Sequence, residues 1–287
     1  PYLPCTHVHT DNLRASLTML SFALSGRGRP TGPPVSATGA RTELRPPSRP
    51  GPGVRYRDAM AVLDTALPRG VDIAVDAGNA GAAAIHHLPA RRDGRFLIAL
   101  GMGGMGYSFG AGIGMAFGRA HRHRTGSARA AGAAGLSRAS RTPRTIVIAG
   151  DGAFFMHGME IHTAVQYRLP VTFVLFNNNA HAMCVTREQL YYADRYTYNR
   201  FRPSNLGAGL AAMFPGLAAV DVADIDTLAG AVRAALAVAG PSVISVECSA
   251  DEIPPFAPFL AATDVDHVAQ QPVPMREESP DHVTVCA

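Results

Sequence analysis

Two polar clusters in the chain have the residue types and the spacing of a single binding site. They are Gly150-Asp151-Gly152 and Asn177-Asn178-Asn179. Each cluster follows an apolar run, 145–149 and 171–176, that predicts a strand buried on both faces. In an open parallel sheet, the loops that follow neighbouring strands lie at the same edge, and ligands bind there. We therefore expect the two clusters to face one site.

The groups in these clusters favour a cation together with a phosphate. The carboxylate of Asp151, the amide oxygen of Asn178 and a main-chain carbonyl beyond it would give Mg²⁺ the hard oxygen ligands that it prefers. The backbone N–H groups of Gly152 and Ala153 open the next helix and could bind the phosphate. A Gly-Asp-Gly sequence alone is more often only a tight turn, but the second cluster at this distance favours the site.

The segments around the clusters predict how they are positioned. Ile161, Ala164 and Val165 have helical spacing, so a helix should join the two strands in a right-handed βαβ crossover. Other buried strands are predicted at 71–75, 97–100 and 243–247. Other helices are predicted at 57–67, 205–213 and 225–237. This alternation is typical of α/β proteins with a parallel sheet.

Two glycine-containing loops upstream could also approach a ligand. The loop 76–81 leads from a predicted strand into a helix, whose N-terminus is a second candidate phosphate site. The loop 101–106 has four glycines, and a backbone without Cβ atoms can lie close to a ligand. Each loop by itself could be an ordinary turn, and Met105 in the second loop could be a gap-filler of the core.

The Gly-Asp-Gly sequence, followed at this distance by Asn-Asn, resembles the cofactor-binding signature of thiamine-diphosphate enzymes. The segment is similar to the acetolactate (acetohydroxyacid) synthase branch, and the similarity continues through 164–167, 169–171, Met183 and 190–192. The resemblance covers about 56–259, which corresponds to one of three family domains. It implies an α/β fold with a three-layer α/β/α parallel sheet.

The resemblance implies roles for individual residues in binding Mg²⁺ and the diphosphate. The implied Mg²⁺ ligands are Asp151, Asn178 and the main-chain oxygen of Ala180. The implied diphosphate site is the helix N-terminus at Gly78, Asn79 and Ala80.

For the remainder of the cofactor, the resemblance implies contacts with two methionines and one glycine. Met105 would be the catalytic wedge that forces the cofactor into its bent conformation. The carbonyl of Gly103 would accept a hydrogen bond from the aminopyrimidine, and Met183 would also contact the cofactor.

The implied activity is that of a carboligase, a transferase that decarboxylates a 2-oxo acid and joins the remaining carbons to an acceptor. A simple 2-oxo-acid decarboxylase and a non-catalytic partner subunit are the alternatives. The glutamate that activates the cofactor in this family belongs to a separate pyrimidine-binding domain, and Glu160 is not a substitute for it. We therefore expect the chain to need a pyrimidine-binding domain or subunit within a homo- or hetero-oligomer.

One residue of the predicted acceptor pocket departs from the synthase pattern. Arg187 stands where the synthases have a tryptophan. The arginine could bind an acidic acceptor, or it could be an exposed residue of a helix. The adjacent His86 and His87 are not assigned a catalytic role, because the histidine pair used by some family members lies in the other cofactor-binding domain.

Composition excludes several classes of function. The formal net charge of +4 comes with no aromatic residues among the basic ones, so no nucleic-acid partner is expected. No apolar run approaches ~18 residues, so no membrane span is predicted. The four cysteines are scattered without a CxxC pair, which argues against a disulfide framework and fits the cytoplasm.

The chain is predicted to have four parts. Residues 1–24 resemble the last helix of a preceding domain, with Asp11 as its cap, and 25–55 have the composition of a flexible linker. The thiamine-diphosphate-binding domain is expected at 56–262, followed by a tail at 263–287. Within that domain, 121–144 reads as an exposed insertion with solvated arginines. A fragment of a longer enzyme, or one half of a split enzyme, is expected.

Overall fold

The computed structural model describes residues 11–25, 44–47, 51–90, 94–124, 144–195 and 198–263. The chain divides into two units, 1–43 and 44–287, and each is described by itself. Most of the predicted linker and insertion, and nearly all of the predicted tail, lie outside the described residues. The boundaries of the four predicted parts therefore stay predictions.

The second unit is built on a six-stranded, all-parallel sheet with the strand order β2-β1-β3-β4-β6-β5. The strands are β1 (Asp72–Val75), β2 (Phe96–Ile98), β3 (Thr145–Gly150), β4 (Val171–Asn177), β5 (Ala218–Val222) and β6 (Ser242–Glu247). All seven residues of β4 are buried, as its continuous apolar sequence predicts for a central parallel strand. The strands predicted from the sequence are confirmed within one or two residues at each end, except that β5 was not predicted.

The edge strand β5 escaped prediction because its sequence carries little of the signal of a buried strand. It reads Ala-Ala-Val-Asp-Val, and only Val222 at its end is buried. It pairs with β6 alone, so one of its backbone edges and most of its side chains face outward. A strand is predicted from the apolar residues that it buries, and β5 buries few of them.

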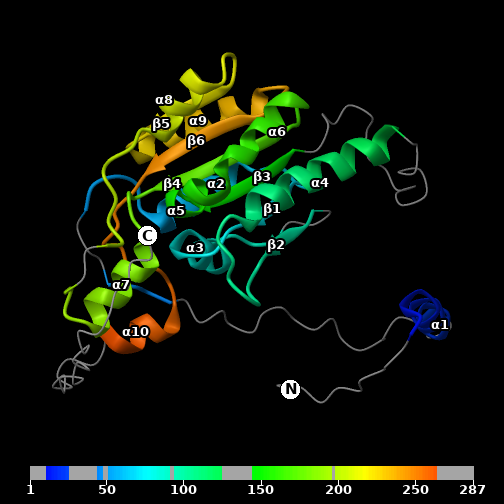
Figure 1. Ribbon diagram of the computed structural model, residues 1–287, viewed down its shortest axis with the longest axis horizontal. Coiled ribbons are helices and arrows are strands. Elements are labelled where there is room, and N and C mark those ends of the chain that lie inside the picture. Colours follow the sequence, from blue (N-terminus) through cyan, green and yellow to red (C-terminus); the bar gives the residue numbers. More distant parts are fainter. Residues whose placement is uncertain are drawn as a thin grey trace, which may run out of the picture. The chain divides into compact units, whose positions relative to one another are not determined.

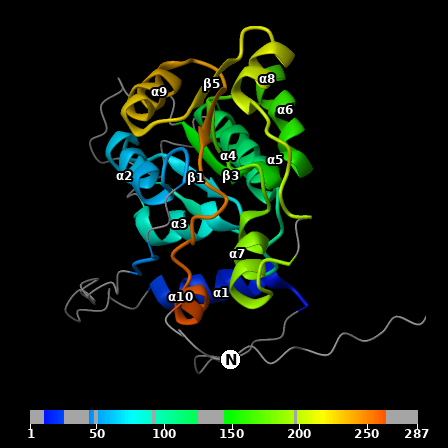
Figure 2. The ribbon, with the colours of Figure 1, turned by 90° about the vertical axis from the view of Figure 1, so that its left-hand side faces the viewer.

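Helices cover both faces of the sheet and form the outer layers (Figures 1 and 2). On one face, α2 (Tyr56–Ala66), α3 (Asn79–His87) and α9 (Ile225–Ala237) share a hydrophobic core with the sheet. On the other, the core is completed by α4 (Tyr107–Arg124), α5 (Asp151–His157), α6 (Ile161–Gln166) and α8 (Leu206–Met213). A 3-10 turn, Gly158–Glu160, separates α5 from α6. The predicted three-layer α/β/α fold is confirmed.

Two helices lie outside these layers. They are α7 (Ala182–Tyr191), which follows β4, and α10 (Ala257–Thr263), which contacts α7. No helix among the described residues combines the length and the apolar content that crossing a membrane requires.

The first unit contains helix α1 (Leu13–Ser25). The prediction that Asp11 caps this helix is wrong, because the side-chain oxygen of Asn12 accepts the N–H of Ala15 at 3.0 Å instead. An oxygen that accepts the N–H three residues later is the usual N-cap arrangement. The capping residue therefore lies one position later than predicted.

The structure corrects the prediction that every arginine of 121–144 is solvated. Arg144 is buried, and its guanidinium donates to the hydroxyl of Thr172 at 3.0 Å and to the carbonyls of Val238 and Gly240. These contacts tie the start of β3 to β4 and to the segment before β6. Since Val54 is also buried and donates its N–H to the Glu247 carbonyl at 2.7 Å, packing begins just before the predicted domain start.

Candidate functional site

Four loops meet at the carboxyl edge of the sheet because β1, β2, β3 and β4 all run in the same direction. They are residues 76–79, 99–106, 150–152 and 178–181. The helices α3, α5 and α7 begin at or just after three of these loops, and α5 and α7 lie at this end of the sheet in Figure 1. The predicted metal- and cofactor-binding residues lie in one of these loops or within two residues of it, whereas Arg187 lies further along α7.

Asp151 joins the loop after β3 to the loop after β4. Its side chain is buried, with 1% of the residue exposed. One carboxylate oxygen accepts the N–H of Gly152 at 2.9 Å, and the other accepts the N–H of Ala180 at 3.1 Å. The expected juxtaposition of Asp151 with the segment after Asn178 is therefore present.

The N–H of Gly152 differs from its predicted state. It was expected to be available for a phosphate, but in this structure it donates to the carboxylate of Asp151. The reason is local: α5 begins at Asp151, so this carboxylate can bend back onto the first turn of its own helix. The contribution of Ala153 to an anion site stays a prediction.

Burial gives the Asp151 carboxylate an unusual protonation behaviour. Removal from water raises its pKa to about 6, and hydrogen bonds from Gly152 and Ala180 oppose the increase. A desolvated carboxylate gains more from a nearby cation than an exposed one does. The environment of Asp151 therefore fits the binding of a metal ion.

Asn178, in the loop after β4, has a buried acceptor atom. Its amide nitrogen donates to the hydroxyl of Tyr56 at 2.8 Å. Its amide oxygen is buried and has no hydrogen-bond partner within the described parts of the chain. Buried polar atoms normally have partners, so a lone acceptor here is consistent with a cation ligand.

The backbone at Ala180 forms an antiparallel bridge with Arg200. The flanking residues make the two hydrogen bonds of this bridge. The His181 N–H donates to the Asn199 carbonyl, and the Phe201 N–H donates to the Asn179 carbonyl. In such a non-hydrogen-bonded pair, the N–H and the C=O of Ala180 both turn away from the 199–201 segment. Because this N–H reaches Asp151, the carbonyl of Ala180 is oriented to the same side, as a third ligand would require.

Other metal-binding arrangements are not favoured by the described residues. Among them, no three His, Cys, Asp or Glu side chains are grouped so that they could hold an ion. The predicted site has one carboxylate, one amide oxygen and one carbonyl. Such an all-oxygen set fits Mg²⁺ rather than zinc.

The loop after β1 leads into α3 through a glycine with open space beside it. Gly78 has φ +91°, and a Cβ at this position would meet no described atom within 4 Å. Asn79 and Ala80, which open α3, are buried. The Asn79 amide nitrogen is 3.4 Å from the Glu252 carbonyl, and its amide oxygen has no partner in the described structure. To donate to a diphosphate, this amide would have to rotate.

Asp76 holds the glycine-rich loop at the same edge of the sheet. This buried carboxylate accepts the N–H of Gly106 at 2.9 Å and the hydroxyl of Ser108 at 2.7 Å. Gly103, in the same loop, has φ +66° and faces space that no described atom fills within 4 Å. The sequence did not single out Asp76, because nothing in the pattern links it to residues thirty positions later.

Met105 and His181 lie next to Gly152. A Cβ added to Gly152 would stand 3.0 Å from the Met105 methyl and 2.6 Å from the His181 Nδ1 atom. Met105 thus reaches the loop after β3, whereas Met183 lies half-buried in the first turn of α7, and its predicted contact stays untested.

His181 is a residue of this region that the sequence analysis missed. Its Nδ1 atom is buried, and none of the described residues forms a hydrogen bond with it. Its ring packs edge-on against Phe201 at 4.7 Å between centroids. The available signal was its position directly after the predicted ligand Ala180.

Arg187 and the histidine pair both contact other residues of the chain. Arg187 is exposed, and its guanidinium carbon lies 5.8 Å from the centroid of the Phe259 ring in α10. His86 accepts the N–H of Leu44 at 3.1 Å, and its ring contacts that of His87. The omission of the histidine pair from the catalytic set stays a prediction.

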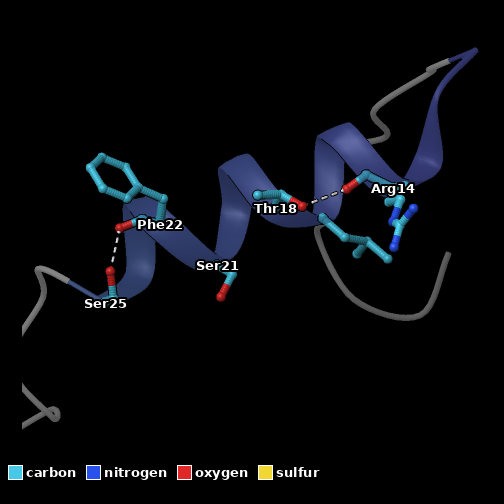
Figure 3. A pocket seen from close by; sticks show the side chains of 6 residues that line it. Arg14, Thr18, Ser21, Phe22 and Ser25 are labelled. Atoms are coloured by element: carbon cyan, nitrogen blue, oxygen red, sulfur yellow. Dashed lines mark hydrogen bonds between the residues drawn. The ribbon is translucent and has the colours of Figure 1, made fainter.

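A hollow along α1 is not a comparable site. It is lined by side chains of that helix alone, among them Arg14, Thr18, Phe22 and Ser25 (Figure 3). The hydroxyls of Thr18 and Ser25 donate to carbonyls of their own helix. A surface formed by one helix encloses no ligand.

Comparisons with known proteins show what the chain is similar to. A family model described as thiamine pyrophosphate enzyme, C-terminal TPP binding domain, matches residues 76–246. The chain is 30% identical over 207 residues to a Mycobacterium tuberculosis protein described as an acetolactate synthase large subunit, IlvB2, covering 70% of this chain and 32% of that protein. It is 32% identical over 127 residues to the mitochondrial acetolactate synthase of Schizosaccharomyces pombe, covering 44% and 19%.

A solved structure resembles the fold. The crystal structure of benzoylformate decarboxylase from Polynucleobacter necessarius matches with a TM-score of 0.60 and 20% identity, covering 74% of this chain and 36% of that one. At this identity the match bears on the fold alone. The chain spans about a third or less of the length of the relatives that it matches.

Proposed function

Because the chain belongs to the C-terminal TPP-binding domain family of thiamine pyrophosphate enzymes, we propose that it is the diphosphate- and Mg²⁺-binding half of a carboligase. The complete enzyme would decarboxylate a 2-oxo acid and join the remaining carbons to an acceptor, as the names of the similar acetolactate synthases suggest for those proteins. Mg²⁺, the substrates and the cytoplasmic location are all part of the proposal.

The observation that carries the proposal is the oxygen set at the carboxyl edge of the sheet. Two neighbouring loops supply three oxygens: the buried carboxylate of Asp151, the amide oxygen of Asn178, which has no partner among the described residues, and the carbonyl of Ala180, which turns away from the 199–201 segment. These residues would hold Mg²⁺, which favours oxygen ligands and commonly also takes them from phosphates. The charge of the ion would also compensate the desolvation of Asp151.

The other predicted residues would bind and shape the cofactor. Gly78, Asn79 and Ala80 would hold the diphosphate at the start of α3, with Ala153 at the start of α5. Gly103 would accept from the aminopyrimidine through its carbonyl, while Met105 and Met183 would contact the cofactor. When bound, thiamine diphosphate supplies a carbon nucleophile that adds to the keto group of a 2-oxo acid and accepts the electrons released as carbon dioxide leaves.

The proposal includes a partner that provides the activating carboxylate. In the family that the sequence resembles, the activating glutamate belongs to the pyrimidine-binding domain, so the chain would bind the cofactor without activating it. We expect activity only with a pyrimidine-binding domain or subunit, in a homo- or hetero-oligomer. Turnover of pyruvate by the purified 287-residue chain alone would contradict this expectation.

Cofactor binding is tested by calorimetry with variants of the two side-chain ligands. Asp151→Ala and Asn178→Ala each remove one liganding oxygen, and each should weaken the Mg²⁺-dependent binding of thiamine diphosphate by at least ~10-fold. Arg187→Ala, which changes an exposed residue of α7, is the control and should leave the affinity unchanged. Equal affinities in all three variants would refute the metal assignment.

The reaction class is tested by product analysis of the assembled enzyme. With pyruvate and an aldehyde or a second 2-oxo acid, a carboligase forms an acyloin or an acetohydroxy acid. A simple decarboxylase releases free aldehyde, and a non-catalytic subunit gives neither product. The first outcome is the one that we expect.

A further inference from the structure

The hydroxyl of Tyr56 is the one described acceptor for the amide nitrogen of Asn178. Tyr56 is 1% exposed, and its ring packs against Phe176 with 5.2 Å between the ring centroids. The hydroxyl accepts from Asn178 at 2.8 Å and from the thiol of Cys248 at 3.7 Å. Because packing fixes the ring, the hydroxyl is held in one position, within hydrogen-bond distance of the Asn178 amide.

The backbone of Tyr56 is fixed as well. Its N–H lies 3.2 Å from both carboxylate oxygens of Glu252, a residue that is itself largely buried. The carbonyl of Glu252 in turn faces the amide nitrogen of Asn79. The start of α2, the segment after β6 and the two predicted binding loops are thus connected through Tyr56 and Glu252.

We propose that Tyr56 is a positioning residue for the Mg²⁺ ligand Asn178. Its hydroxyl holds the amide nitrogen, which leaves the amide oxygen available to the cation. This inference rests on the proposed function and adds to it a residue from the start of the folded unit. No binding role for that residue follows from the sequence motif or from the family match, which begins at residue 76.

The physical need for such a residue comes from the symmetry of the amide group. The oxygen and the NH₂ of asparagine have nearly the same shape, but only the oxygen can bind a cation. A rotated amide would direct two N–H groups at the metal and would repel it. The hydrogen bond from the amide nitrogen to the Tyr56 hydroxyl would hold the observed orientation before the metal arrives, as groups behind metal ligands commonly do. The hydroxyl could also donate to the oxygen of a rotated amide, and the cation excludes that arrangement.

The test measures metal affinity in Tyr56→Phe, which keeps the ring and removes the hydroxyl. Mn²⁺ substitutes for Mg²⁺ at oxygen sites. Mn²⁺ is titrated by electron paramagnetic resonance in the presence of inorganic diphosphate, whose proposed contacts all lie in this chain. We expect the dissociation constant of Mn²⁺ to rise about 10- to 100-fold in the variant, the usual range for the loss of a group that orients a ligand.

Two further variants separate positioning from general damage to the core. Thr172→Val removes another buried hydroxyl of the same unit, from the opposite end of β4, and should leave the metal affinity unchanged. Asn178→Asp supplies two equivalent oxygens, so Tyr56→Phe should have little effect on affinity in that background. A purely structural role for Tyr56 would weaken binding equally in both backgrounds.

The outcomes distinguish this inference from the proposed function. Binding by the unchanged chain together with equal binding by Tyr56→Phe overturns the positioning role and leaves the metal site intact. The same loss of affinity in the Asn178→Asp background also overturns it. Absence of metal binding by the unchanged chain overturns the proposed metal site, and this inference with it.

Discussion

Replacement of Asp151 by asparagine should change how the stability of the metal-free protein depends on pH. The residue is buried, and burial raises the pKa of its carboxyl to about 6 from an ordinary value of 3.8. Asparagine has nearly the same size and does not titrate. Any change in hydrogen bonding to Gly152 and Ala180 adds an offset that is constant with pH, so the pH-dependent difference belongs to the carboxyl group.

The sign follows from the two pKa values. The folded state binds the proton of the Asp151 carboxyl more tightly than the unfolded state does. The resulting stabilisation is therefore fully present at a pH below the pKa of the unfolded state, and it is lost as the pH rises through the pKa of the folded state. A difference of about two pKa units corresponds to roughly 3 kcal/mol, since one unit is worth 1.36 kcal/mol. About 2 kcal/mol of this loss falls between about pH 4.5 and pH 7.5.

The assay is urea unfolding of both proteins in a chelating buffer across that range. The free energy of unfolding of the unchanged protein should fall by about 2 kcal/mol relative to Asp151→Asn as the pH rises. Mg²⁺ with diphosphate at neutral pH should then stabilise the unchanged protein and not the variant. A difference between the two proteins that stays constant with pH would show that the carboxylate is well solvated, and the reasoning would be refuted.

Two further predictions concern the scaffold of the site. Gly106→Ala should destabilise the protein by more than ~2 kcal/mol in thermal unfolding, because φ is +90° and the new Cβ would stand 2.2 Å from the His157 ring. The matched control Gly104→Ala, where a Cβ meets no described atom within 4 Å, should change stability by less than ~0.5 kcal/mol, and equal losses would contradict the explanation. Asp72→Asn should cost roughly 3 kcal/mol, because this fully buried carboxylate is paired with Arg119 at 2.5 Å and with a more exposed second arginine. A loss below ~1 kcal/mol in urea unfolding would show that the pairs contribute little.

The sequence by itself determined the parallel sheet and the positions of the binding loops. Asp151 and Asn178 each follow a continuous apolar strand, and adjacent parallel strands necessarily bring such loops to one edge. Local patterns are sufficient for this conclusion, because strand burial and chain direction decide it. The 3.1 Å contact between Asp151 and Ala180 is the consequence.

Only the tertiary structure decided which side chains hold those loops in place. Tyr56 contacts Asn178 from a helix that comes more than a hundred residues earlier in the chain. The buried guanidinium of Arg144 donates to carbonyls that lie far along the sequence. Such contacts depend on how helices and strands pack across the sheet, which leaves no local periodicity or motif. The edge strand β5 is decided in the same way, since its pairing with β6, rather than its own sequence, makes it a strand.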